Sequence, residues 1–123
     1  MWRAFACCLF AGVVLARPAF AADRAALDAL IIAHAGANGV PVALLREVIR
    51  RESNFNPRAV HRGNYGLMQV RLGTARALGY RGDAAGLLDP AVNMSYGARY
   101  LAGAYRAARG NEARTLALYT RGY

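Results

Sequence analysis

The feature of this sequence that most limits its fold is the spacing of its apolar residues, which recur every three or four positions and seldom alternate with polar ones. That spacing matches a helix with one buried face, whereas a strand needs a period of two. Gly, Pro, Asp and Asn fall between the apolar stretches, where they start and end helices. We therefore predict an all-α domain, with helices over 24–35, 41–53, 90–109 and 112–119 and a brief helix between Thr74 and Gly79.

Local signals mark the ends of these helices. Asp23, Asp89 and Asn111 each stand where a side-chain oxygen can cap a first turn, and Pro41 and Pro90 suit a first helical position. Glycines at 36 and 39 are expected to end the first helix.

Two glycines lie inside the expected 90–109 helix. Gly97 and Gly103 each cost up to about 1 kcal/mol there relative to alanine. Such positions usually mark close packing by a neighbouring helix, for which we expect the 41–53 helix. Asn93 is expected to tie the same two helices together.

The 41–53 helix carries a carboxylate on its apolar face. Ile49, Val48 and Leu45 precede Glu52 by three, four and seven positions, so all four share one stripe. Partial burial disfavours the charged form and raises the pKa, as a general acid near neutral pH requires. The alternative is a helix-end carboxylate that reaches water, and the stripe alone does not separate the two. Glu47 lies on the opposite face, where it is expected to form solvated ion pairs with arginines 50 and 51.

Short motifs surround Glu52. The string from Val48 to Pro57 reads VIRRESNFNP, and Gly66-Leu67-Met68-Gln69, Leu88-Asp89-Pro90 and Ala117-Leu118-Tyr119 follow it. In order and spacing these motifs resemble the SLT-type lytic transglycosylases, lysozyme-like enzymes that cleave bacterial peptidoglycan. The resemblance covers roughly residues 40–123. It implies a small, single-domain, lysozyme-like helical fold with a glycan-binding groove.

The resemblance also implies a reaction. In this family one Glu protonates the oxygen of the β-1,4 bond between N-acetylmuramic acid and N-acetylglucosamine, and the sugar's acetamide stabilises the developing cation. The same carboxylate then takes the proton of the C6 hydroxyl as it attacks C1, which gives a 1,6-anhydro end without a metal or cofactor. Glu52 is the matching residue. Ordinary glycosidases use two carboxylates, and none of the other six here has a comparable flank.

Binding roles carry over residue by residue. Met68 and Gln69 match the family pair that lines the glycan groove. Tyr119 matches the tyrosine whose hydroxyl contacts the catalytic carboxylate, and Ser53 matches the residue that supports the helix end. Read without the family, Met68 is core filler, Tyr119 an aromatic anchor and Ser53 a simple helix-end hydroxyl. His61 stands where the family usually has Ser, and is either a donor to the substrate acetamide or a surface histidine.

The N-terminus has the pattern of a secretory signal peptide. A positive Arg3 precedes an apolar run, and Ala19-Phe20-Ala21 provides a small-x-small cleavage site. We predict a leader over residues 1–21 and a mature domain over residues 22–123. Both cysteines, Cys7 and Cys8, fall in the leader, so no disulfide is expected in the mature domain.

Charge narrows the choice of partner. All sixteen basic residues are arginines, and residues 22–123 keep fourteen of them against seven acids, a net charge of +7. Such a chain is drawn to polyanions, and export favours peptidoglycan strands in the periplasm over nucleic acid, for which no binding motif is present. We expect a monomer with no membrane insertion after cleavage of the leader, acting alone or beside a cell-envelope machine.

Two other functions stay open at this point. A hydrolytic muramidase would use water in place of the C6 hydroxyl. A basic peptidoglycan-binding or assembly module would keep the fold without turnover. The presence of Glu52, Gln69 and Tyr119 weighs against it, whereas two departures from the family pattern, His61 in place of Ser and Thr120 in place of Asn, keep it open.

Overall fold

The computed structural model describes residues 19–123. The predicted leader therefore lies outside the described residues, except for its last three positions, which fall in helix α1 (Ala19–Asn38). Asp23 lies within this helix, so the prediction that it caps the first turn is wrong. Alanine has the highest helix propensity, and the alanines at 19, 21 and 22 extend the helix past the expected start.

Helix α1 ends at its second glycine. Gly39 adopts a φ of 65°, a left-handed conformation that glycine enters without strain. Its N–H donates to the carbonyl of Gly36, and the N–H of Val40 donates to the carbonyl of Ala35. Val40 and Ala35 are both buried, which completes a Schellman cap with its apolar contact. Gly36 itself remains helical, so only one of the two predicted stop signals ends the helix.

Helix α2 (Val42–Ser53) follows at once, within one residue of its predicted bounds. A small antiparallel sheet comes next, with strands β1 (Val60–His61), β2 (Asn64–Tyr65) and β3 (Val70–Arg71) in the order β1-β2-β3. Tyr65 lies opposite Val60 on one side and Val70 on the other. The sequence does not predict this sheet, because strands of two residues carry no periodic signal.

The rest of the chain is helical: α3 (Leu72–Ala77), the short 3₁₀ helix η1 (Ala85–Leu88), α4 (Pro90–Ala107) and α5 (Glu112–Arg121). Two predicted caps are confirmed. Asp89 Oδ1 accepts the Val92 N–H at 3.0 Å, and Asn111 Oδ1 accepts the Arg114 N–H at 2.9 Å. The brief helix α3 starts two residues before Thr74, at a point where the chain leaves β3.

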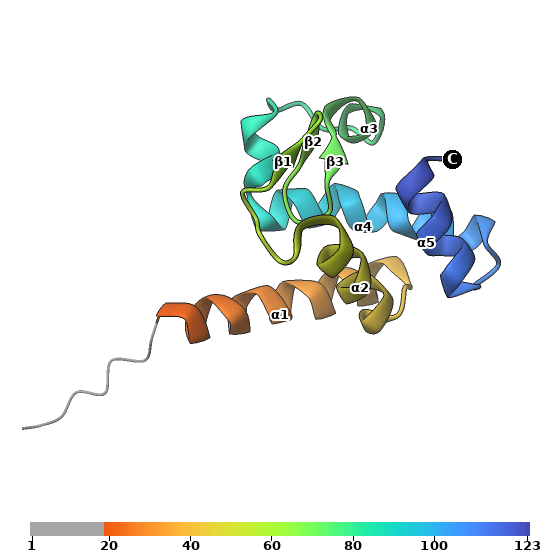
Figure 1. Cartoon of the computed structure of the whole chain (residues 1–123), viewed down its shortest axis with the longest axis horizontal. Coiled ribbons are helices and arrows are strands. Elements are labelled where there is room, and N and C mark those ends of the chain that lie inside the picture. Colours follow the sequence, from red (N-terminus) through yellow and green to blue (C-terminus); the bar gives the residue numbers. More distant parts are fainter. Residues whose placement is uncertain (1–18) are drawn as a thin grey trace, which may run out of the picture.

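Helix α4 crosses the middle of the molecule (Figure 1). It packs against α1 and α5, and it also contacts η1 and β3. The buried core gathers around it and includes Ile31, Leu44, Leu45, Ile49, Leu67, Met68, Leu87, Met94 and Leu101. Within residues 19–123, no helix combines the length and the apolarity needed to cross a bilayer.

The prediction that helix α2 packs against the two glycines of α4 is wrong. Gly97 makes room for the side chain of Met68, and Gly103 lies against the ring of Tyr123. Both glycines therefore allow a close approach to α4, as predicted. The groups that approach are side chains next to β3 and α5, and not helix α2.

Asn93 also has different partners from those expected. Its Oδ1 accepts the main-chain N–H of Met68 at 2.8 Å, and its Nδ2 donates to the carbonyls of Tyr65 and Leu87 at 2.6 and 2.8 Å. The side chain is fully buried. It ties α4 to the sheet region and to η1, and so fixes the segment that leads into Gln69.

Candidate active site

Glu52 is the next-to-last residue of α2 and projects from its buried face. Leu45, Val48 and Ile49, which share its stripe, are all buried. The carboxylate is half-buried, and this desolvation raises its pKa above the usual range. The partial burial predicted from the apolar stripe is therefore confirmed.

Glu47 shows the opposite behaviour on the same helix. Its carboxylate accepts hydrogen bonds from Arg50 at 2.7 and 2.9 Å and from Arg51 at 2.8 Å. Hydrogen bonds from these two guanidinium groups lower its pKa to about 2. The predicted solvated ion pairs are confirmed, and they engage the two arginines that precede Glu52 in the chain.

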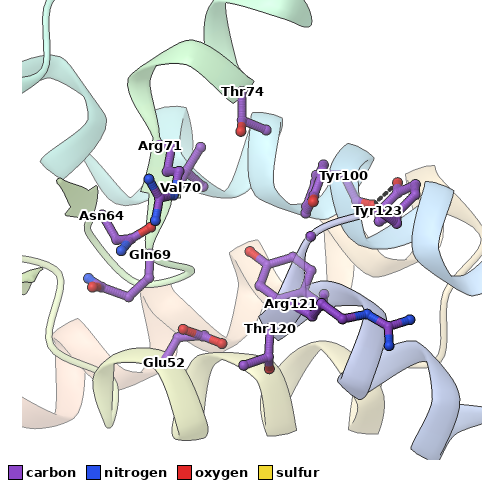
Figure 2. Close-up of a pocket in the computed structure, with 12 residues that line it drawn as sticks. Glu52, Asn64, Gln69, Val70, Arg71, Thr74, Tyr100, Thr120, Arg121 and Tyr123 are labelled. Atoms are coloured by element: carbon purple, nitrogen blue, oxygen red, sulfur yellow. Dashed lines mark hydrogen bonds between the residues drawn. The ribbon is translucent and has the colours of Figure 1, made fainter. Parts of the chain in front are cut away.

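Two adjoining cavities form a groove around Glu52. One has a volume of about 590 Å³ and reaches toward α5, and the other, of about 690 Å³, reaches along the loop and β1. Glu52, Asn64 and Gln69 line both. In Figure 2 the Glu52 carboxylate lies between Gln69 on the sheet side and Thr120 on the α5 side. Glu52 is the only side-chain carboxylate among the residues that line either cavity.

Ser53 anchors the end of α2 to the core. Its hydroxyl lies 2.7 Å from the carbonyl of Leu67 and 3.1 Å from that of Ile49, and both carbonyls are acceptors for its single proton. This is the support of the helix end that the family resemblance implies. Because its hydroxyl is engaged with the backbone, Ser53 holds Glu52 in place, although it also lines the second cavity.

Gln69 is held by its own loop. Its backbone is left-handed, with a φ of 51°, and its Nε2 donates to the carbonyls of Gly66 at 2.9 Å and Ala59 at 3.1 Å. These two acceptors identify the nitrogen end of the amide. The Oε1 oxygen is therefore the end that remains to accept a hydrogen bond from a ligand in the groove.

Tyr119 forms part of the wall of the first cavity, and its hydroxyl points into the core. The hydroxyl donates to the carbonyl of Met68 at 2.6 Å. Burial, together with the negative charge of Glu52, raises the Tyr119 pKa well above its usual range, so the phenol keeps its proton. Among residues 19–123, its hydrogen-bond acceptor is Met68 and not Glu52, which differs from the contact that the family resemblance implies.

Met68 is fully buried against α4 at Gly97. Its side chain is therefore not part of the groove wall in this structure, and the interpretation as core filler describes its position. Its main chain still matters to the site, because its N–H and carbonyl are the points at which Asn93 and Tyr119 hold the residue before Gln69.

His61 lines the second cavity from strand β1 and is exposed. The groove also contains residues that no sequence pattern assigns to it, among them Asn64, Arg71, Thr74, Tyr100 and Arg121. Tyr100 packs edge-on against Tyr119 with ring centroids 5.4 Å apart. Only the folding of the short sheet and of α5 against α4 brings these residues to Glu52, so no local pattern in the sequence identifies them.

The arrangement supplies one protonatable carboxylate, a carboxamide oxygen and an aromatic wall in an open groove. In the described part of the chain, no group of three or more His, Cys, Asp or Glu side chains is placed to hold a metal ion. A half-buried carboxylate with a raised pKa can donate a proton to a bound ligand and take one back.

Comparisons with known proteins agree with this geometry. Residues 29–123 match the family described as "Transglycosylase SLT domain". The chain is 37% identical over 99 residues to peptidoglycan transglycosylase gp16 of Escherichia phage T7, an alignment that covers 77% of this chain and 8% of the phage protein. The structure of the 70-kDa soluble lytic transglycosylase in complex with bulgecin A is similar at a TM-score of 0.72 and 27% identity, over 78% of this chain and 17% of that one. The chain thus spans only a small part of the length of either relative.

Proposed function

We propose that this chain, which belongs to the transglycosylase SLT domain family, cleaves the bond between N-acetylmuramic acid and N-acetylglucosamine in peptidoglycan without using water. One observation carries the proposal: the groove offers a single side-chain carboxylate, that of Glu52, and its partial burial raises its pKa. The phage relative is named as a peptidoglycan transglycosylase and the 70-kDa protein as a lytic transglycosylase, which supports the proposal.

The proposed reaction runs through Glu52 twice. As an acid, Glu52 gives its proton to the glycosidic oxygen, and the bond from that oxygen to C1 of the N-acetylmuramic acid breaks. The substrate acetamide stabilises the cation at C1. As a base, the carboxylate then takes the proton of the C6 hydroxyl while the oxygen of that hydroxyl bonds to C1. This step restores the acid and gives a 1,6-anhydro end. The nucleophile is already tethered to the substrate, so no water has to be held.

The neighbouring residues support these steps. Ser53 fixes the end of the helix that carries Glu52. The amide oxygen of Gln69 is placed to accept a hydrogen bond from a sugar, and the rings of Tyr119 and Tyr100 form an apolar wall beside it. We assign His61 to the same groove as a candidate donor to the acetamide, in the position where the family usually has Ser.

The absence of a second carboxylate from the groove argues against a hydrolytic muramidase, since activating a water normally needs one. The non-catalytic module is less well supported, because a binding protein gains nothing from a desolvated carboxylate. We further propose export to the periplasm through the leader at residues 1–21, where the domain acts on the wall alone or beside an envelope machine.

Replacing one carboxylate tests the proposal. Glu52→Gln keeps the shape of the side chain and removes the transferable proton, so release of soluble muropeptides from sacculi should fall by about a thousandfold or more. Glu112→Gln is the matched control, because Glu112 lies in the first turn of α5 outside both cavities, and it should keep nearly the full rate. An active Glu52→Gln enzyme would show that the acid lies elsewhere.

A further inference from the structure

The groove around Glu52 is strongly basic. Six arginines line its two cavities against the single carboxylate: Arg50, Arg51, Arg58, Arg62, Arg71 and Arg121. The other acids of the chain have different surroundings. Asp28 pairs with Arg46, Glu47 pairs with Arg50 and Arg51, and Asp83 and Asp89 accept backbone N–H groups.

Four of these arginines have no partner within residues 19–123. Arg50 and Arg51 bind Glu47, but the side chains of Arg58, Arg62, Arg71 and Arg121 are exposed and form no ion pair or side-chain hydrogen bond with any described residue. Like charges gathered on one surface repel each other at some cost to folding, so no structural gain accounts for their position.

The four arginines lie on both sides of Glu52. Arg58 and Arg62 flank β1 in the second cavity, and Arg71 and Arg121 line the first from β3 and α5. Figure 2 shows Arg71 on the sheet side of Glu52 and Arg121 on the α5 side. A glycan that crosses Glu52 therefore passes free guanidinium groups before and after the bond to be cut.

The sugar rings of peptidoglycan carry no charge that would call for such groups. Its anions are the carboxylates of the short stem peptides, which are attached to the lactyl group of each N-acetylmuramic acid. Guanidinium groups pair with carboxylates through two parallel hydrogen bonds and lose little hydration on doing so. Because stem peptides occur on every second sugar, they lie on both sides of the scissile bond.

We propose that Arg58, Arg62, Arg71 and Arg121 bind stem-peptide carboxylates, so that the domain prefers peptide-bearing glycan to bare glycan. This inference rests on the proposed function, since it assumes that a peptidoglycan strand occupies the groove. It adds a second recognition element to the sugar contacts near Glu52 and depends on charge.

Binding to three forms of the glycan tests the proposal. The first is peptide-bearing strands freed from cross-links by an endopeptidase, the second is the same strands with their carboxylates amidated, and the third is strands stripped by an amidase, which keep only the lactyl carboxylate. Affinity is measured in the Glu52→Gln background, so the result does not depend on turnover. Arg58→Gln with Arg62→Gln is compared with Arg81→Gln with Arg114→Gln, which removes equal charge from exposed positions outside both cavities.

We expect the Arg58/Arg62 pair of substitutions to raise Kd for peptide-bearing strands by roughly three- to tenfold, the loss expected for two exposed carboxylate–guanidinium pairs. Amidated and stripped strands should bind the Arg58/Arg62 variant and the Arg81/Arg114 control with the same Kd. The Arg81/Arg114 substitutions should leave the Kd for all three kinds of strand unchanged. Equal weakening on all three strands, no weakening on any, or the same loss on stripped as on peptide-bearing strands would each overturn the proposal. Failure of the proposed reaction appears separately, as a wild-type protein that binds peptide-bearing strands in this pattern but releases no muropeptides.

Discussion

The phenolic hydroxyl of Tyr119 donates a hydrogen bond of 2.6 Å to the main-chain carbonyl of Met68, 51 residues earlier in the chain. Both residues are buried, so the bond is shielded from water. It joins α5 to the segment that ends in Gln69. The two walls of the groove are thereby fixed to each other directly beside Glu52.

Tyr119→Phe should reveal how much this hydrogen bond contributes to the free energy of unfolding. The substitution keeps the ring but leaves the buried carbonyl of Met68 without its donor, so the free energy of unfolding should fall by about 1–3 kcal/mol. Urea unfolding measures the change. Tyr105→Phe is the control, because the Tyr105 hydroxyl has no hydrogen bond to another described residue, and it should shift the midpoint little.

Asn93→Leu should be more damaging. It leaves the main-chain N–H of Met68 without an acceptor and the carbonyls of Tyr65 and Leu87 without a donor. Losing several buried hydrogen bonds at once should cost about 3 kcal/mol or more in urea unfolding. Asn38→Ala removes only one bond at the end of α1 and should cost under about 1 kcal/mol. Similar losses for the two variants would contradict the central role given to Asn93.

The helices followed from local residues, and for that reason much of the fold was predictable. The caps at Asp89 and Asn111 depend only on the three residues that follow each of them, and both formed as predicted. Asp23 failed because the alanines before it continue the helix, a competition that cap rules do not weigh.

Long-range features were not predictable in the same way. The spacing of Leu45, Val48 and Ile49 was enough to place Glu52 at a buried face, since all lie on one helix. Met68, which contacts both Asn93 and Gly97, lies 25 residues before Asn93 in the chain, and helical periodicity contains no information about such a contact. The groove arginines are likewise brought together by tertiary folding, and in the sequence they look like scattered surface charges.

Glu47→Gln should flatten the acid dependence of stability. The folded pKa of Glu47 is about 2 against a reference value of 4.5, so this carboxylate stabilises the native state above pH 4.5 and loses that contribution as the pH falls toward 2. Urea midpoints at several pH values measure the effect. The wild type should be the more stable protein near neutral pH, and the difference should shrink on acidification. A constant difference would contradict the ion pairs.

Glu52→Gln should act on stability in the opposite sense. Because the folded pKa is raised, the native state holds the proton more tightly than the unfolded chain, and stability falls as the pH rises from about 4.5 through the folded pKa. The glutamine variant lacks this fall, so it should be as stable as the wild type or more stable above that range. Thermal unfolding across the range checks the sign.

The proposed activity of the wild-type domain should follow the same group. In the proposed reaction Glu52 begins protonated, so the rate of muropeptide release should decline as the pH rises through its raised pKa. The decline should lie above the ordinary range of a glutamate. A rate that rises through this interval and stays high in alkali would contradict protonation by Glu52.

Mass spectrometry of the products, formed in water labelled with heavy oxygen, tests the central claim most directly. If Glu52 serves as both acid and base and the C6 hydroxyl is the nucleophile, the new ends are 1,6-anhydro-N-acetylmuramic acid, lighter than the reducing sugar by one water molecule and free of the label. Reducing N-acetylmuramic acid ends that carry heavy oxygen at C1 would show that water is the nucleophile, and would contradict the account.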